Sequence, residues 1–156
     1  MLAKTLLMLA LVLAAAIVPA CAKDVAVVSN KSGTVTALTM ADLAKICKAQ
    51  TNRWSNGTPV TLIMREPTLP EMKMVGEKIF GMTPNEIRDL IATANHGRTN
   101  HPAILVADSD EDVIRRVQSA PGAVGLVDVY SITGAVNVVK IGGKLPLEPG
   151  YPLHGN

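Results

Sequence analysis

The sequence contains few aromatic residues. They make up 3% of its 156 residues and comprise Trp54, Phe80, Tyr130 and Tyr151. Sites for sugars and unpaired bases commonly use several rings on which the ligand stacks. A charge of one sign is missing as well, because the formal net charge is only +2. Without a basic field, the chain has no electrostatic attraction for nucleic acid. These two absences argue against a nucleic-acid or sugar partner.

Long apolar runs are absent after the N-terminal region. Leu6 to Val18 is an unbroken apolar stretch behind a basic start at Lys4. It is too short to span a bilayer and has the length of a secretory signal. Small residues precede the expected cut after Ala22, which predicts a signal peptide at 1–22. The remainder, 23–156, is expected to be one domain with no transmembrane segment, exported to the periplasm or secreted.

The segment from Val18 to Cys21 also fits a lipoprotein cleavage site loosely, with Cys21 as the acylated residue. We favour cleavage after Ala22, and lipid anchoring at Cys21 stays open as the alternative. After cleavage at Ala22, Cys47 is the only cysteine left, so no internal disulfide can form. Met40, Leu43 and Cys47 share one apolar helical face, which predicts a buried and unreactive thiol.

The remaining sequence alternates between strands and helices. Apolar segments near 24–30, 59–64, 104–107, 122–129 and 135–141 are predicted strands. Capping residues predict helix starts at Thr39, Thr68, Thr83 and Ser109. This alternation predicts an α/β domain with a central β-sheet flanked by helices.

Motifs for catalysis or metal binding are missing. There is no nucleophile elbow, phosphate-binding loop or zinc-protease motif, so we expect no enzyme activity, no catalytic residue and no cofactor. His96 and His101 stand in one loop without cysteine or a close carboxylate, which does not indicate a metal site.

Two polar segments follow predicted strands and are candidate ligand sites. One contains Arg65 and Thr68, and the other contains Ser29, Asn30 and Ser32. Ligands of α/β sheets usually bind where strands end and the next helices begin, because free amides and the helix dipole attract anions there. The sequence therefore predicts an oxyanion site that uses these residues.

An internal partner for Arg65 is the competing interpretation. Thr68 and Glu71 have the spacing of a capping box, in which each side chain bonds the other residue's amide. Glu66 and Glu71 would also cancel much of the attraction of Arg65 for an anion. Pro70 removes one amide donor. On these grounds we favour a glutamate over an anion as the partner of Arg65.

The sequence resembles a known family over most of residues 24–141. The segments that carry the resemblance are "LTMADLAKICKAQTNRWSNGTPVTLIMRE" and "SDEDVIRRVQSAPGAVGLVDV". Their most specific parts are Trp54 with Asn56-Gly57, then Arg65, then Pro121 to Gly125. They are similar to the periplasmic phosphate-binding proteins, the solute receptors of phosphate ABC transporters.

The resemblance implies a fold and a ligand. The receptors have two α/β lobes that hold phosphate between them through amides, hydroxyls and an arginine, and this chain resembles the single lobe that carries the arginine. By position, Arg65 matches that arginine. The Ser-Gly-Thr that follows it in the family is replaced here by Thr68-Leu69-Pro70-Glu71.

Two functions remain open from the sequence. The first is binding of inorganic phosphate or a similar oxyanion, in association with phosphate ABC transport. The second is an interaction or assembly module of the cell envelope that has lost phosphate binding and associates with itself or with another protein.

Overall fold

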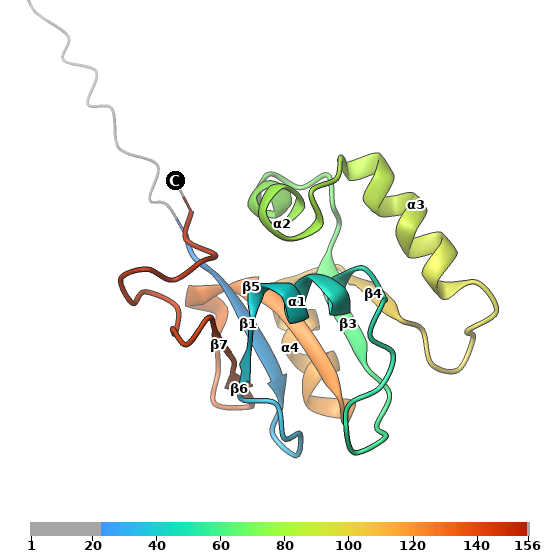
Figure 1. Ribbon diagram of the computed structural model, residues 1–156, viewed down its shortest axis with the longest axis horizontal. Helices are drawn as coiled ribbons and strands as arrows, with labels where there is room; N and C mark the ends of the chain where they lie inside the picture. The colour runs from blue at the N-terminus through green and yellow to red at the C-terminus, as the bar shows by residue number, and fades with distance from the viewer. Residues whose placement is uncertain (1–22, 156) are drawn as a thin grey trace, which may run out of the picture.

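The computed structural model describes residues 23–155, and the predicted signal peptide at 1–22 lies outside the described residues. A five-stranded sheet forms the centre of the molecule, with strand order β4-β3-β5-β1-β6 (Figure 1). Its strands are β1 (Val25–Asn30), β3 (Thr61–Arg65), β4 (Ile104–Ala107), β5 (Ala123–Asp128) and β6 (Val136–Val138).

The direction of the strands decides which residues lie at the same end of the sheet, where strands begin or finish. β3 runs parallel to β4 and β5, whereas β1 runs antiparallel to β5 and β6. Val25 therefore pairs with Asp128, at the carboxyl end of β5, and Ser29 pairs with Val124 near its start. As a result, the last residues of β1 lie at the end of the sheet where β3 and β5 begin.

Helices cover both faces of the sheet. On β1, Val25 and Val27 face one hydrophobic cluster, and Ala26 and Val28 face the other, as the two-residue period of a strand requires. The first cluster includes residues of α1 (Met40–Cys47), α2 (Lys73–Val75) and α3 (Pro84–Asn95). The second includes residues of α4 (Asp110–Ser119). Figure 1 shows the same three layers, which confirms the predicted α/β fold.

Three of the four predicted helix starts are confirmed. The hydroxyls of Thr39, Thr83 and Ser109 each accept a hydrogen bond from the backbone amide three residues later. At Thr83 the capping box is complete, because the Glu86 carboxylate accepts from the Thr83 amide in return. These caps satisfy amides that the first turn of a helix leaves without partners.

The predicted capping box at Thr68 is wrong. The N-cap residue is Leu69, which has extended dihedrals and makes no side-chain capping bond, and Thr68 is exposed. The cause is Pro70, because a proline disfavours the helical conformation of the residue before it. The chain then passes through the 3-10 helix η1 (Pro70–Met72), α2 and the π-helix η2 (Gly76–Phe80).

The C-terminal part forms smaller elements. After β5 come the 3-10 helix η3 (Val129–Ser131), β6 and β7 (Lys140–Ile141), and β7 pairs in parallel with β2 (Ala37–Leu38). The predicted strand at 135–141 is thus two short strands. The coil that follows packs against β1, because Leu153 is buried and its carbonyl accepts from the Val25 amide. Within 23–155 no helix has both the length and the apolar character that crossing a membrane requires.

Candidate functional site

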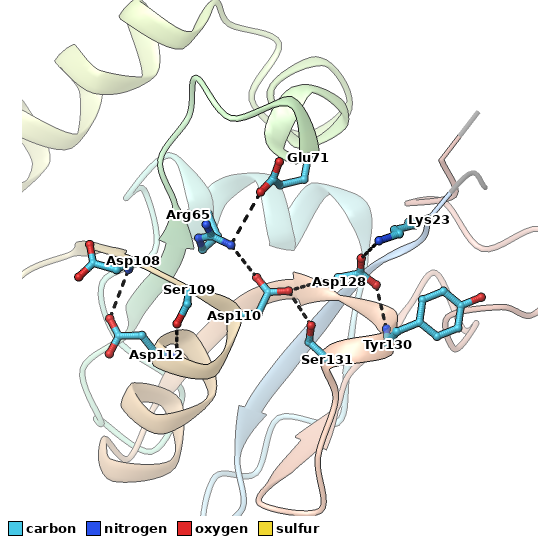
Figure 2. A network of polar contacts seen from close by, with 10 residues as sticks. All are labelled: Lys23, Arg65, Glu71, Asp108, Ser109, Asp110, Asp112, Asp128, Tyr130 and Ser131. Carbon is cyan, nitrogen blue, oxygen red and sulfur yellow. Dashed lines mark hydrogen bonds and ion pairs between the residues drawn. The ribbon is translucent and has the colours of Figure 1, made fainter. Parts of the chain in front are cut away.

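Arg65 is the last residue of β3 and follows the buried residues Leu62 to Met64. The strand fixes its backbone at the edge of the sheet, and only 18% of its side chain is exposed. Its Nη1 lies 3.3 Å from Oδ1 of Asp110 and 3.9 Å from Oε1 of Glu71. Figure 2 shows the guanidinium between these two carboxylates, with Asp110 on α4 and Glu71 on η1.

Asp110 is the firmly held partner. It is the first residue of α4, and its carboxylate is 16% exposed. Oδ2 accepts hydrogen bonds from the Asp128 amide at 3.1 Å and from the Ser131 hydroxyl at 2.8 Å. Asp110 therefore links the ends of β3 and β5 to the start of α4, and moving it would break three polar contacts at once.

Glu71 is the loosely held partner. Its side chain is 55% exposed, and its contact with Arg65 is longer than a hydrogen bond. Exposed ion pairs of this kind contribute only about 0–1 kcal/mol, because water screens them. The carboxylate can therefore leave the guanidinium at little cost. The predicted internal partner is confirmed as far as Glu71 contacts Arg65, but Asp110 is the closer carboxylate.

Part of the Arg65 guanidinium has no partner among residues 23–155. Its Nε is buried without a hydrogen bond, and the ion pairs of the side chain with Asp110 and Glu71 both come from Nη1. A buried donor without an acceptor is uncommon in folded proteins and costs about 1–3 kcal/mol. The guanidinium thus has unused donors for a further acceptor.

A groove of about 710 Å³ opens beside Arg65. We call it the Arg65 groove. Cationic side chains that line it are Lys23, Arg65, Lys73 and Lys78. Carboxylates that line it are Asp24, Glu71, Glu77, Asp110 and Asp128. Four cations and five carboxylates give a formal charge of −1 when His154 is neutral. Its volume is that of a small-molecule site, but its charge is nearly balanced.

The rim of the Arg65 groove is made by the two ends of the described chain. Nζ of Lys23 lies 3.2 Å from Oδ2 of Asp128. The buried carboxylate of Asp24 contacts Nδ1 of His154 at 2.6 Å and accepts from the Leu147 amide at 2.7 Å. Lys78 donates to the His154 carbonyl at 2.7 Å. These contacts fasten the C-terminal coil to β1 and to η2.

The second predicted segment lies at the other end of the sheet. Because β1 is antiparallel to its neighbours, Ser29 and Asn30 stand where β3 and β5 begin, away from Arg65. The two segments therefore lie at opposite ends of the sheet, and the turn from Ser29 to Ser32 does not lie beside Arg65. The sequence shows that 24–30 is a buried strand, but not in which direction it runs. A role of either segment in ligand binding stays a prediction.

The polar groups of that segment are used within the protein. Ser29 Oγ donates to the Val35 carbonyl. The side-chain Nδ2 of Asn30 donates to the backbone carbonyls of Val117 and Gln118. Oδ1 of Asn30 accepts from both the amide and the hydroxyl of Ser32. The cavity beside them is only about 40 Å³, enough for water but not for a drug-sized ligand. These contacts tie the turn after β1 to the end of α4.

Two parts of the family resemblance, those that contain Trp54 and Gly122, lie at this end of the sheet and hold segments of the fold together. Trp54 Nε1 donates to the Gly122 carbonyl at 2.9 Å. Gly122 has φ +83°, and a Cβ there would lie 2.3 Å from the Pro59 carbonyl oxygen. Only glycine fits so close to another backbone. Trp54 and Gly122 thus join the segment before β3 to the segment before β5.

Several residues of the Arg65 groove were not identified from the sequence. Asp110 is an acidic residue in the first turn of α4, which the helix dipole alone explains, and Asp128 and Lys23 belong to no motif. Asp110 could have been found from topology, because α4 follows β4 and β4 lies parallel beside β3. A residue at the start of α4 must then lie near the end of β3, where Arg65 stands.

Other titratable groups show structural roles. Asp112 is buried and binds both Arg115 and Arg116, and the hydrogen bond from Arg116 lowers its pKa. Burial raises the pKa of the Cys47 thiol, so it stays protonated, as expected of an unreactive cysteine. Among the described residues, no group of three His, Cys, Asp or Glu side chains is placed to bind a metal ion.

The fold and the Arg65 groove define a class, the single lobe of a periplasmic-binding-protein fold. A family model described as the PBP superfamily domain matches residues 12–155. The chain therefore belongs to the family that this model describes, the PBP superfamily domain. Among curated proteins, none matches the chain.

Solved structures with the same fold are named as phosphate receptors. An ABC-type phosphate transport receptor from Vibrio cholerae has a TM-score of 0.66 at 19% identity, over 86% of this chain and 54% of the receptor. PstS from Borrelia burgdorferi has a TM-score of 0.65 at 16% identity, over 86% and 55%. A phosphate-binding protein from Stenotrophomonas maltophilia has 0.59 at 16%, over 80% and 40%. This chain thus spans about half the length of these proteins, and the likeness is one of fold.

Proposed function

We propose that the protein binds an oxyanion, inorganic phosphate by its likeness to the solved receptors, at Arg65. The observation that supports this most is the position of the Arg65 guanidinium and the small number of contacts that it makes. It stands at the carboxyl end of β3 beside a groove, with Nε lacking a partner and with a loosely held Glu71 as its second contact. An arginine that projects from the end of a strand is a strong donor for an oxyanion.

Binding requires that Glu71 leaves Arg65. Asp110 stays in place, because the Asp128 amide and the Ser131 hydroxyl hold it, and it keeps the guanidinium oriented. The anion then takes the place of the Glu71 carboxylate and accepts from Nη1, the guanidinium atom that Glu71 contacts. Since the contact with Glu71 is exposed, giving it up costs about 0–1 kcal/mol.

A single lobe leaves one side of the ligand in water. Good ligand sites bury most of the ligand, which lowers the dielectric around each hydrogen bond. We therefore infer that phosphate binds with a Kd near 1 mM unless a second copy or a partner protein closes the Arg65 groove. A role in phosphate ABC transport would require such a partner.

Thermal melting of the purified protein in phosphate-free buffer tests the proposal. At 10 mM phosphate and a Kd near 1 mM, linkage gives about 1.4 kcal/mol, which raises the melting temperature by about 3–6 °C. Arg65→Ala should lose the shift, whereas Arg98→Ala, in an exposed loop, should keep it. If phosphate, sulfate and related oxyanions all leave the wild-type melting temperature unchanged, oxyanion binding is ruled out.

A second candidate function is an interaction module of the cell envelope. The charge of the Arg65 groove favours it, because a lining of formal charge −1 repels a free anion. In this case the groove is a surface for a second copy of the chain or for an envelope protein. A sizing column run over a hundredfold range of concentration should then show an oligomer. A monomer at every concentration that captures no envelope protein argues against this function.

The place of the protein in the cell forms part of the proposal. We infer that it is exported to the periplasm and released by cleavage after Ala22, with acylation at Cys21 as the alternative. The mass of the protein isolated from its native envelope separates the two, because acylation leaves Cys21 as the first residue and adds fatty acyl chains. A chain that still starts at Met1 would contradict export through a cleaved signal.

A further inference from the structure

In the Arg65 groove, the loosely held ion pair between Arg65 and Glu71 lies near other carboxylates that line the same groove. Glu71 contacts Arg65 only from a distance and is largely exposed, whereas Asp110 and Asp128 are held in place. An anion that displaces Glu71 leaves this carboxylate without a cation. The same anion also comes close to the Asp110 carboxylate, which already contacts the Arg65 guanidinium. Both effects oppose a ligand that carries negative charge alone.

Free cations for the displaced carboxylate are scarce. Lys23 is paired with Asp128, Lys73 lies 3.9 Å from Glu77, and Lys78 donates to the His154 carbonyl. Lys23 and Lys78 thus already have close acceptors, whereas Lys73 has only a distant and exposed contact of the same length as that between Glu71 and Arg65. A ligand that brings its own cation would restore the charge balance without breaking any of these contacts.

We propose that the preferred ligand of the Arg65 groove is a small zwitterion, in which an oxyanion and a primary ammonium are joined by a short carbon linker. This inference rests on the proposed function, since the oxyanion must bind at Arg65. The anionic head replaces Glu71 at the guanidinium, and the ammonium binds the Glu71 carboxylate that has been displaced. Binding thereby replaces the Arg65–Glu71 ion pair with two others. One joins Arg65 to the anionic head of the ligand, and one joins Glu71 to its ammonium.

The surroundings of Arg65 suit such a ligand. Glu71 is on η1 and Arg65 is on β3, so the two can separate when η1 shifts without breaking the sheet. The groove also has apolar walls, to which Met74 and Leu126 contribute, where a short carbon linker can lie. Phosphate monoesters, phosphonates and carboxylates of this shape share the chemistry that the groove recognises.

Three ligands, two of them matched in shape, test the inference by isothermal titration calorimetry. They are inorganic phosphate, ethyl phosphate and O-phosphoethanolamine, and the last two differ chiefly by the ammonium group. O-phosphoethanolamine should bind the wild-type protein about tenfold more tightly than ethyl phosphate, the effect of one charge-assisted hydrogen bond. Glu71→Gln should reduce this ratio to about twofold or less. Asp89→Asn, which removes one carboxylate from the exposed face of α3, should leave it unchanged.

The outcomes separate this inference from the proposed function. Equal affinity for ethyl phosphate and O-phosphoethanolamine overturns the zwitterion and leaves oxyanion binding intact. If none of the three ligands binds the wild-type protein or Glu71→Gln, the proposed function itself fails. A preference for O-phosphoethanolamine that persists in Glu71→Gln contradicts the assignment of the ammonium to Glu71.

The same headgroup chemistry occurs free in solution and on phosphatidylethanolamine. Cosedimentation with vesicles of phosphatidylethanolamine in phosphatidylcholine distinguishes the sources, with pure phosphatidylcholine vesicles as the control. Binding that needs phosphatidylethanolamine and is lost in Glu71→Gln supports a lipid source. Binding of O-phosphoethanolamine without cosedimentation supports a free metabolite.

Discussion

The carboxylate of Asp110 holds Arg65 in place, with Oδ1 3.3 Å from Nη1 and with Oδ2 accepting from Asp128 and Ser131. Asp110 begins α4 and Arg65 ends β3, so this pair joins two layers of the fold. The Asp110 carboxylate has three partners, whereas Glu71 has one distant contact. The two carboxylates around Arg65 therefore have different roles, one structural and one exchangeable.

Replacing Asp110 should destabilise the protein. Asp110→Ala leaves the half-buried Arg65 charge without its close partner and removes the acceptor of the Asp128 amide and the Ser131 hydroxyl. We expect the free energy of unfolding to fall by about 2–3 kcal/mol, measured by urea denaturation. Asp108→Ala is the matched control, because Asp108 is exposed and its carboxylate has no hydrogen-bond or ion-pair partner among the described residues. Equal effects of the two substitutions would contradict the structural role of Asp110.

Replacing Glu71 should affect binding more than stability. Glu71→Ala removes an exposed and distant contact, so the free energy of unfolding should change by less than about 1 kcal/mol. The same change removes the competitor for Arg65, so the affinity for inorganic phosphate should rise about threefold or more, measured by calorimetry. Reduced phosphate affinity in Glu71→Ala would show that Glu71 helps to bind the anion instead of competing with it.

The fold was largely predictable because the signals for its elements are local. The capping residues at Thr83 and Ser109 and the buried apolar run of β1 are local signals, and the structure confirms the elements that they predict. The direction of β1 depends on pairing with β5, about a hundred residues later in the chain. No local pattern encodes that pairing, so the sequence does not show that Ser29 and Asn30 lie at the opposite end of the sheet from Arg65.

The candidate site was only partly predictable for a related reason. Arg65 was identified because it directly follows a buried strand, and Glu71 because it is near in sequence. Asp110 is 45 positions away and has a local explanation as a first-turn acidic residue. Its contact with Arg65 exists only because β4 pairs in parallel with β3, which brings the start of α4 to the end of β3.

Gly122 should tolerate no side chain. Gly122→Ala places a Cβ 2.3 Å from the Pro59 carbonyl oxygen and forces alanine to adopt φ +83°. We expect a loss of about 3 kcal/mol or more, measured by urea denaturation, since backbone cannot move away as a flexible side chain can. Gly134→Ala is the control, because a Cβ at Gly134 meets nothing within 4 Å and its φ is not positive. A loss below 1 kcal/mol at Gly122 would show that the contact with Pro59 relaxes freely.

The stability contributed by Asp112 should depend on pH in a predictable direction. Its pKa in the folded protein is lowered, first by the hydrogen bond from Arg116, so the unfolded chain binds its proton more readily. The contribution is therefore fully present above the unfolded pKa of about 3.9 and is lost as the pH falls through the lowered folded pKa. The difference in urea midpoint between wild type and Asp112→Asn should be large at pH 7 and shrink below about pH 4. A difference that stays constant down to pH 2 would contradict this assignment.

The buried hydroxyl of Tyr151 should stabilise the C-terminal coil against β1. It donates to the Val25 carbonyl at 2.8 Å, and burial raises its pKa, which keeps it protonated as a donor. Tyr151→Phe leaves that carbonyl without this partner, which should cost about 1–2 kcal/mol in urea denaturation. Tyr130→Phe is the matched control, because Tyr130 is 73% exposed and its hydroxyl makes no hydrogen bond within residues 23–155. Similar losses in both variants would mean that the Tyr151 hydroxyl does not hold the coil to β1.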